Sequence, residues 1–401
     1  MRCLDRAQLR DALLDARRTT CVLLDDLSDA QWEVPQLAII NRPLWELGHV
    51  GWFMEFWCLR RGDRARPSLL PQADRCYDSS AVAHATRWDL PLPAREATHG
   101  YVAEVLERTL EQLAGENDGD AALYPYRLAL YHEDMHGEAF VLLRQALGYP
   151  APSLPALAAP GLADSLPQHD VLVDGVAFMQ GVADLPGGGF RFDNEGEPFE
   201  STLATYAIAA APVSNALFEA FVAAGGYANP TWWDPAGWAW RVAVGAESPG
   251  AWRRIDGGWQ QRLFDRWLPL DPQAPVRHVS AFEAEAWCRW ARRRLPTESE
   301  WEFAAARGLI DPSTPAAQRV WEWTATPFAP YPGFEPGPYR DYSQPWFHTH
   351  RVLRGASAAT PQRLHGAHFR NFYLPERRDI LAGFRTCALS PDDALPQRRS
   401  P

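Results

Sequence analysis

The sequence predicts an all-helical half followed by an α+β half, and three observations support this division. Residues 1–148 carry apolar side chains at three- and four-residue spacing, which is the helical period. A Pro/Ala/Leu-rich stretch without periodicity follows at residues 151–168, and we expect it to form an ordered or semi-rigid linker. From His169 onward, short strand-like runs alternate with turns rich in Gly, Pro and Asn.

Length and composition limit the class of protein. A chain of 401 residues is too long for one ordinary core, so two or three domains are expected. The hydrophobic content of 46% and charged content of 22% are typical of a soluble globular protein. A net charge of −11 argues against nucleic acid or an anionic membrane as partner. No apolar run reaches the ~18 residues that a membrane span requires, so no membrane-spanning segment is expected.

The N-terminal segment and the cysteines predict a cytoplasmic protein. The first 18 residues carry charges throughout and no apolar core, which is unlike a secretory signal. The six cysteines form no C-x-x-C pair, and they are Cys3, Cys21, Cys58, Cys76, Cys288 and Cys387. Without an export signal, reduced thiols are expected, and the wide spacing excludes a zinc ribbon.

Four amphipathic segments in the first half predict a four-helix bundle. They are residues 5–27, 44–61, 98–114 and 126–147. The connection over residues 62–94 is long, and a connection of this length is usually functional or packed as a loop. Two short helices are expected in the second half, at residues 215–226 and 280–294.

His132 and His136 belong to an H-E-x-x-H sequence, the pattern of zinc proteases. Because they lie four residues apart on a predicted helix, both imidazoles project from one face and could share a metal. A protease of this type needs a third ligand further along the chain. Neither Gly-x-x-His nor a further helix follows His136 before the linker. A zinc-dependent hydrolase with Glu133 as its base is therefore kept only as the alternative function.

His49 supplies a better third ligand. It lies on an otherwise apolar face of the second predicted helix, and metal sites in helix bundles are built from facing helices. Together with His132 and His136 it would form a three-histidine facial site, although a lone buried histidine is more often a core residue. Three neutral imidazoles suit Zn, Fe or Cu. Because no carboxylate offsets the cation, bound Fe(II) would keep its full charge and attract a thiolate or selenolate and then O2.

An ordered series of motifs in the second half resembles the formylglycine-generating-enzyme-like domain, which is related to C-type lectins. The motifs are FDNEGEP (192–198), WWDPAGWAW (232–240), VWEWT (320–324), VLRGAS (352–357), FRNFYLPERR (369–378) and GFRT (383–386). The helical half, with LGH and H-x-x-x-H, resembles the DinB-like domain. The fusion is similar to ergothioneine-type sulfoxide synthases and selenoneine synthases over nearly the whole chain. The resemblance implies a DinB-like four-helix bundle at 1–150 and a C-type-lectin-like domain at 169–395.

The same resemblance implies an oxidoreductase with Fe(II) as cofactor and O2 as co-substrate. The implied iron ligands are His49, His132 and His136. The implied reaction attaches sulfur or selenium to the imidazole C2 carbon of hercynine, which is N-trimethylhistidine. The H-E-x-x-H match is then a coincidence of spacing. Formylglycine-generating enzymes have a reactive cysteine pair near the C-terminus, and this chain lacks it. Cys288 and Cys387 are far apart in the sequence and are expected to be core thiols.

The FRNFYLP segment implies substrate contacts. Asn371 and Phe372 correspond to residues of the hercynine pocket. For Arg370 and Arg377, a substrate contact and a structural ion pair are equally expected. Hercynine carries a trimethylammonium group without N–H, so only aromatic faces and dipoles can hold it. Tyr339 and Tyr342 are the candidates for the tyrosine proton donor of the family, and each is alternatively structural.

Two departures from the sulfoxide synthases concern the sulfur or selenium donor. Met135 stands where those enzymes have a Gln that contacts hercynine, and Phe372-Tyr373 replaces a Trp-Asp pair. The missing Asp helps to bind the amino group of γ-glutamylcysteine. Of the basic residues that hold the carboxylates of that donor, Arg87 is the one retained. A selenosugar, which needs fewer charged contacts, is therefore favoured slightly over a thiol donor.

Overall fold

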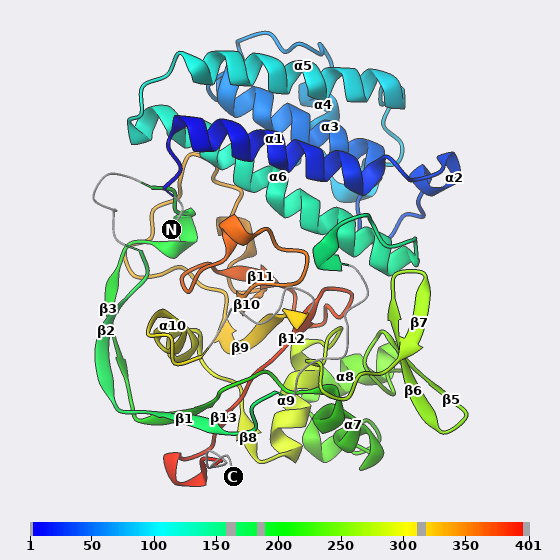
Figure 1. Ribbon diagram of the computed structural model, residues 1–401, viewed down its shortest axis with the longest axis vertical. Helices are drawn as coiled ribbons and strands as arrows, with labels where there is room; N and C mark the ends of the chain where they lie inside the picture. The colour runs from blue at the N-terminus through cyan, green and yellow to red at the C-terminus, as the bar shows by residue number, and fades with distance from the viewer. Residues whose placement is uncertain (1–2, 158–165, 183–188, 311–317, 396–401) are drawn as a thin grey trace. The chain divides into compact units, whose positions relative to one another are not determined.

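The computed structural model describes residues 3–157, 166–182, 189–310 and 318–395 (Figure 1). Of these described residues, those in Met1–Leu154, Asp184–Phe190 and Thr360–Leu364 form one compact unit. Those in Pro155–Ala183, Arg191–Ala359 and His365–Pro401 form the second. Residues 158–165 of the predicted linker lie outside the described residues.

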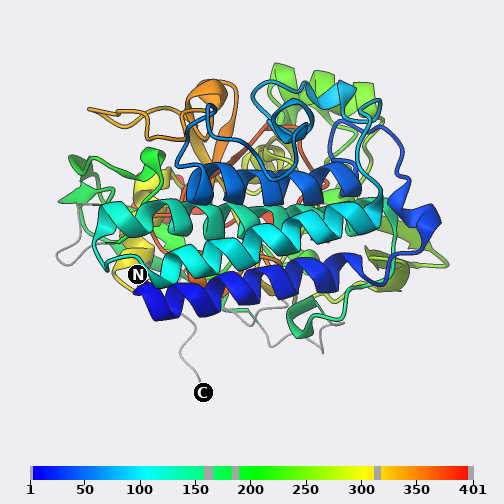
Figure 2. The same cartoon turned by 90° about the horizontal axis from the view of Figure 1, so that it is seen from above.

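The first unit is helical, which confirms the expected class of the N-terminal half. Its helices are α1 (Arg6–Leu24), α2 (Asp29–Trp32), α3 (Pro43–Met54), α4 (Ala73–Tyr77), α5 (Arg95–Ala114) and α6 (Asp120–Leu147). Helix α3 packs against both α5 and α6, and α1 does the same from its own side. The four long helices run alongside one another in both views (Figure 2).

Local sequence explains where these helices begin and end. Asp5 caps α1 through a capping box with Gln8, which satisfies backbone N–H groups that lack partners in the first turn. Pro43 occupies the first turn of α3, where its missing N–H costs nothing. Helix α3 continues into a π-helical turn at Glu55–Leu59. Gly148 ends α6 in the left-handed conformation, which glycine adopts without strain.

The long connection after α3 is packed by buried polar contacts. The Glu55 carboxylate accepts hydrogen bonds from the hydroxyls of Ser68 (2.8 Å) and Tyr101 (2.6 Å). The guanidinium of Arg60, which is only 3% exposed, donates to both carboxylate oxygens of Asp74, at 2.6 and 2.9 Å. Because these groups are removed from water in pairs, they fix the loop instead of destabilising it.

A short segment from the C-terminal half of the sequence, Thr360–Leu364, completes the helical unit. The Arg363 guanidinium donates two hydrogen bonds of 2.6 Å to the Asp134 carboxylate on α6 and one of 2.8 Å to Asp15 on α1. The Thr360 hydroxyl donates to Glu138, again on α6, at 2.8 Å. Burial raises the pKa of Asp134 to about 6, although Arg363 opposes this shift.

The second unit is α+β, with short strands in four small sheets. The strand orders are β1-β4-β13-β8, β11-β10-β9-β12, β2-β3 and β5-β6-β7. The strands are β1 (Asp170–Val173), β2 (Val176–Gln180), β3 (Phe199–Leu203), β4 (Tyr206–Ala209), β5 (Trp252–Ile255), β6 (Gly258–Leu263), β7 (Arg266–Pro269), β8 (Arg293–Arg294), β9 (Trp321–Pro327), β10 (Arg351–Gly355), β11 (Asn371–Tyr373), β12 (Ala382–Gly383) and β13 (Cys387–Ala388).

The helices of this unit are α7 (Asn215–Ala223), α8 (Pro235–Val244), α9 (Ala281–Trp290) and α10 (Glu298–Ala306). All strand pairs are antiparallel among the described residues except β12 with β9, which is parallel. Helices α7 and α9 fall within the two ranges expected to be helical, and α9 and α10 both begin with capping boxes. Cys288 and Cys387 are buried and unbridged, as expected for core thiols.

Fixed charges are buried at the centre of the second unit. The Arg354 guanidinium is fully buried and donates to Glu298 (3.0 Å), Glu302 (2.8 Å) and the Tyr331 hydroxyl (2.9 Å). Arg370 donates to both oxygens of Glu298, at 2.9 and 3.1 Å. Arg370 is thus a structural ion-pair partner in the core, which was one of the two roles expected for it.

Among the described residues, no helix combines the length and the apolar character that crossing a bilayer requires.

Replacing Arg354 by Met should destabilise the second unit, because the Glu302 carboxylate would lose its buried guanidinium partner. Breaking one side of a buried ion pair costs about 3–5 kcal/mol, and we expect a value near the lower end because Glu298 keeps Arg370. Urea unfolding followed by tryptophan fluorescence measures the change. Arg266→Met, at an exposed position, is the matched control. An unfolding midpoint that is equal for the two variants would contradict the prediction.

Candidate metal centre

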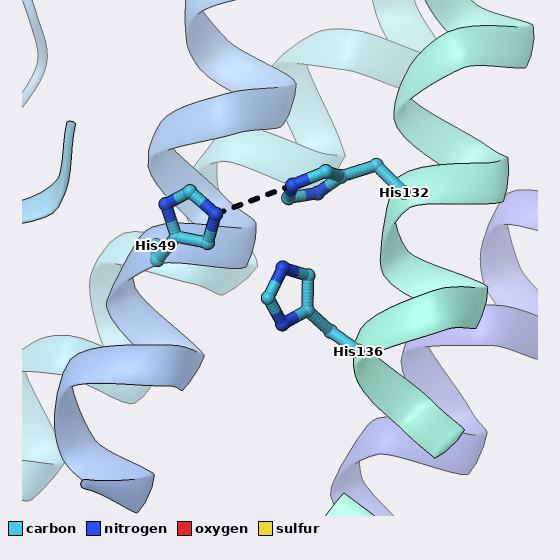
Figure 3. A group of neighbouring side chains, drawn as sticks. All are labelled: His49, His132 and His136. Carbon is cyan, nitrogen blue, oxygen red and sulfur yellow. Dashed lines mark hydrogen bonds between the residues drawn. The ribbon is translucent and has the colours of Figure 1, made fainter. Parts of the chain in front are cut away.

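Three imidazoles converge inside the helical unit, one from α3 and two from α6 (Figure 3). One nitrogen each of His49, His132 and His136 lies within 4.8 Å of the others. The Nε2 atoms of His49 and His132 are 3.2 Å apart. Two nitrogens that each lie about 2.1 Å from one ion are separated by roughly 3.0–3.4 Å, so this pair already has ligand spacing.

Close packing of α3 fixes the position of His49. A Cβ atom on Gly48 would lie 2.2 Å from Cζ of Tyr77, and one on Gly51 would lie 2.5 Å from Cγ1 of Val102. No side chain fits at either position without displacing its neighbour. The two glycines therefore let α3 approach α4 and α5 closely, on either side of the residue that carries the imidazole.

Aromatic rings hold two of the imidazoles in place. The Trp45 ring stacks on His49, with centroids 4.8 Å apart and planes 10° apart. The Phe53 ring stacks on His132, at 3.5 Å and 3°. Trp45 and Phe53 lie four residues before and four after His49, so all three share one face of α3. The Trp45 indole N–H donates to the carbonyl of Cys76 at 2.6 Å, which fixes this ring in turn.

The outer ring nitrogens of two ligands are hydrogen-bonded. Nδ1 of His49 lies 2.7 Å from the carbonyl oxygen of Tyr77, and Nδ1 of His136 lies 2.6 Å from Oε1 of Glu46. Carbonyl and carboxylate oxygens only accept, so both Nδ1 atoms carry the proton and both Nε2 atoms present a lone pair. The group of three histidines itself contains no carboxylate, but the Glu46 carboxylate contacts one of its members directly.

Burial keeps two of the imidazoles neutral. His49 is 2% exposed and His132 is 4% exposed, and burial lowers the pKa of each well below the usual 6.5, with a further contribution from His136. A neutral imidazole can coordinate a metal without first losing a proton. Three imidazoles with converging nitrogens fit Fe, Zn or Cu, and three ligands leave coordination positions open for substrates.

Glu133, the acidic residue of the H-E-x-x-H pattern, serves a different purpose. Its side chain is fully buried and accepts two hydrogen bonds from the Arg17 guanidinium, at 2.7 and 3.1 Å. It also accepts one from the Thr20 hydroxyl at 3.0 Å. Both donors lie on α1, so this carboxylate anchors α6 to α1. The zinc-hydrolase alternative thereby loses its proposed base.

The remaining residues expected in the helical unit lie close to the histidines. The Arg87 guanidinium lies over the Trp45 ring at 3.7 Å, on the indole that also stacks on His49, and it donates to Asn41 at 2.6 Å. Its charge is one of the causes that lower the pKa of His49, after burial. Met135 is half-buried on α6 and directly precedes the third ligand.

Within the second unit, the structure brings the candidate tyrosines near the FRNFY motif. Tyr339 and Tyr342 are half-buried, with ring centroids 6.2 Å apart. Tyr342 stacks on Phe192 at 4.4 Å and lies 6.0 Å from Phe372. Phe372 itself stacks on Phe328 at 4.1 Å. Tyr342 thus has a ring contact with the motif, and Tyr339 lies beside Tyr342.

The three predicted substrate contacts of the motif form strand β11 and are all half-buried. The Oδ1 atom of Asn371 accepts a hydrogen bond from the backbone N–H of Phe372 at 2.9 Å. The Tyr373 ring lies 5.2 Å from the Arg377 guanidinium, which also donates to both oxygens of Asp379 at 2.6 Å. Arg377 thus forms an ion pair, which was one of the two roles expected for it.

Sequence reasoning missed Glu46 and the carbonyl of Tyr77. A signal for Glu46 was present, because it is the single acidic residue in the apolar segment 44-LWELGHVGWF-53 and precedes His49 by three residues. A buried carboxylate at that spacing needs a partner on a facing helix. No sequence signal marks the Tyr77 carbonyl, because every residue has a backbone carbonyl whatever its side chain.

Replacing Gly48 by Ala should weaken metal binding, because the added methyl group displaces the Tyr77 ring and with it the carbonyl that orients His49. Overpacking of this kind costs about 1–3 kcal/mol. Titration of the metal-free protein with Co(II), together with urea unfolding, measures both effects. The control is Gly100→Ala on α5, where nothing lies within 4 Å of the new methyl group. If both variants bind Co(II) like the wild type, the close approach does not support the site.

Comparison with known proteins agrees with the sequence motifs of the second half. Residues 164–318 match the sulfatase-modifying factor enzyme 1-like domain, which confirms the expected formylglycine-generating-enzyme-like character of the second half. The formylglycine-generating enzyme of Thermomonospora curvata is 34% identical over 162 residues, covering 32% of this chain and 50% of that protein. No comparison tests the DinB-like character of the helical half, which stays a prediction.

Two relatives match almost the whole chain. The hercynine oxygenase of Mycolicibacterium thermoresistibile is 34% identical over 434 aligned positions, which cover 95% of this chain and 94% of that protein. The hercynine oxygenase of Mycobacterium tuberculosis is also 34% identical, with 94% and 98% covered. Similarity of this extent includes the helical half of the chain. The chain belongs to the hercynine oxygenase family.

Proposed function

We propose that this chain is a non-haem iron, O2-dependent enzyme that forms a C–Se or C–S bond at the imidazole C2 of hercynine. The observation that carries the proposal is the convergence of His49, His132 and His136, in a chain whose full-length relatives are named hercynine oxygenases. The neutral state of the buried imidazoles and their stacked neighbours support a site that is ready to bind a divalent cation.

Bound Fe(II) would supply the redox chemistry with O2 that Zn(II) lacks, together with open coordination positions. Coupling a thiol or selenol to hercynine removes one hydrogen from C2 and one from the donor. With O2 as the four-electron acceptor, the products are a sulfoxide or selenoxide and water. The chain's own part is to hold the metal through His49, His132 and His136, and to keep the rings of His49 and His132 fixed by stacking.

Residues of the second unit are proposed to bind hercynine and to deliver a proton. Asn371 and Phe372 are the proposed hercynine contacts, and aromatic faces suit a trimethylammonium group that has no hydrogen to donate. Tyr339 and Tyr342 are the proposed proton donors. The ring contact between Tyr342 and Phe372 supports a place for this pair of tyrosines near the proposed hercynine contacts. A phenol hydroxyl beside a reacting oxygen is a suitable general acid.

A selenosugar is the slightly favoured donor, and a thiol is next. Tyr373 occupies the place of an acidic residue, and its ring lies near Arg377, so this position offers no carboxylate for an amino group. Met135 likewise offers no amide. Arg87 is retained, and its guanidinium is stacked on Trp45. A donor with few charged groups makes the smallest demand on these residues.

We also propose a domain organisation and a location for the enzyme. We assign residues 1–150 to a DinB-like bundle, 151–168 to a linker and 169–395 to the lectin-like domain. The proposed partners are small molecules and include neither nucleic acid nor a membrane. The proposed location is the cytoplasm. The net charge of −11 supports this choice of partners.

Anaerobic reconstitution with Fe(II) tests the function directly. With hercynine and one donor present, addition of O2 should give a coupled product by mass spectrometry, and O2 uptake should require both substrates. A selenosugar, cysteine and γ-glutamylcysteine are compared as donors, and the selenosugar should give the highest kcat/KM. Protein loaded with Zn(II) is the control and should form no product. Absence of product with every thiol and selenol tested would refute the proposal.

Two variants separate the iron enzyme from the zinc hydrolase. His49→Ala should lose metal retention and product formation together, because a third of the ligand set is removed. Glu133→Gln should still bind metal, but its loss of charge leaves the Arg17 guanidinium unpaired and lowers stability by about 3 kcal/mol. Metal analysis after gel filtration and urea unfolding measure these effects. Peptide cleavage that survives His49→Ala and disappears in Glu133→Gln would establish the hydrolase instead.

A further inference from the structure

A buried carboxylate lies directly against the metal site. Glu46 is 1% exposed, and its Oε1 atom lies 2.6 Å from Nδ1 of His136. Glu46 precedes His49 by three residues, so both project from the same side of α3 towards α6. Helix α3 therefore supplies one ligand itself and also holds a ligand that comes from the opposite helix.

We infer that Glu46 is a positioning residue, which fixes the tautomer of His136 and lends a negative charge to the metal centre. With Fe(II) bound, the centre and this carboxylate together would carry a net charge of about +1 in place of the +2 of three neutral imidazoles alone. The inference rests on the proposed function, because it requires that the three histidines bind iron.

The tautomer follows from the chemistry of the hydrogen bond. A carboxylate accepts and does not donate, so Nδ1 of His136 carries the proton and Nε2 keeps its lone pair. Partners of this kind orient a ligand imidazole and raise its basicity. His49 has only the neutral carbonyl of Tyr77 in the corresponding place. The two ligands therefore differ, and His136 is the stronger electron donor of this pair.

The charge has a consequence for redox chemistry. In a buried site the attraction between a cation and a carboxylate grows in proportion to the charge of the cation. A triply charged iron gains half as much again as a doubly charged one. Glu46 should therefore bind Fe(III) more strongly than Fe(II), and should lower the Fe(III)/Fe(II) potential.

A second buried glutamate in the same run of helix provides a matched control. Glu55 is also 1% exposed, and its carboxylate accepts from the hydroxyls of Ser68 and Tyr101 and from the backbone of Leu69. These partners tie down the loop after α3, and none of them is a metal ligand. Loss of the Glu55 charge should affect stability without changing the metal.

The experiment compares the full-length wild type with Glu46→Gln and Glu55→Gln. Anaerobic Fe(II) titration in competition with a chromophoric chelator should show about 10- to 100-fold weaker binding in Glu46→Gln. Redox titration of the iron-loaded protein should give a higher potential in that variant, by ~59 mV for each tenfold loss in the preference for Fe(III). Glu55→Gln should match the wild type in both measurements. Glu46→Asp keeps the charge, so its potential should lie closer to that of the wild type.

One further measurement needs no variant. In metal-free wild-type protein labelled with ¹⁵N-histidine, His136 should be observed as the Nδ1–H tautomer, and an Nε2–H tautomer would overturn the inference whether or not Glu46→Gln folds. Equal affinity and potential in Glu46→Gln and the wild type, or equal losses in Glu55→Gln, would also overturn it. None of these readouts involves turnover. Failure of the wild type to bind Fe(II) would instead remove the proposed function itself.

Discussion

The close approach of α3 to its neighbours is the constraint on which the metal site depends. No side chain at Gly48 or Gly51 separates α3 from α4 and α5, so the helix that carries His49 packs closely on both. On this helix the Nε2 atom of His49 lies 3.2 Å from that of His132. Once the backbone is fixed, the stacked rings of Trp45 and Phe53 leave the imidazoles few orientations. The site is thus organised by packing before any cation is present. Packing of the helical unit offsets the conformational entropy that is lost when the ligand side chains are ordered.

Ion pairs between buried charges organise both units. Arg354 joins two glutamates in the second unit, and Arg17 joins Glu133 to α1 in the first. A buried ion pair adds little net stability, but the loss of one partner is costly, so each pair specifies one arrangement of its elements. Glu46 differs, because its partner is a metal ligand and not a guanidinium. A cation held by the three histidines would offset its charge, which would tie this carboxylate to function.

Much of the fold class and the pair His132 and His136 could be predicted from local periodicity, whereas His49 was added because sites in helix bundles are built from facing helices. The spacing of apolar residues gave the helices, and the four-residue interval gave the shared face of His132 and His136. The contacts that orient the trio could not be predicted, because they join residues far apart in the chain. Glu46 and its partner are 90 residues apart, and Arg363 and Asp134 are 229 residues apart. Periodicity contains no information about which distant residue such a carboxylate meets.

The H-E-x-x-H sequence shows why a motif needs its surroundings. Residues four apart on an α-helix are separated by about 40° around the axis, whereas adjacent residues are separated by about 100°. His132 and His136 therefore face α3 together, while Glu133 is turned towards α1 and meets the Arg17 guanidinium there. In a zinc protease the same glutamate must face water beside the metal. The spacing alone specifies two neighbouring imidazoles, and the helix that covers the remaining face decides what the residue between them can do.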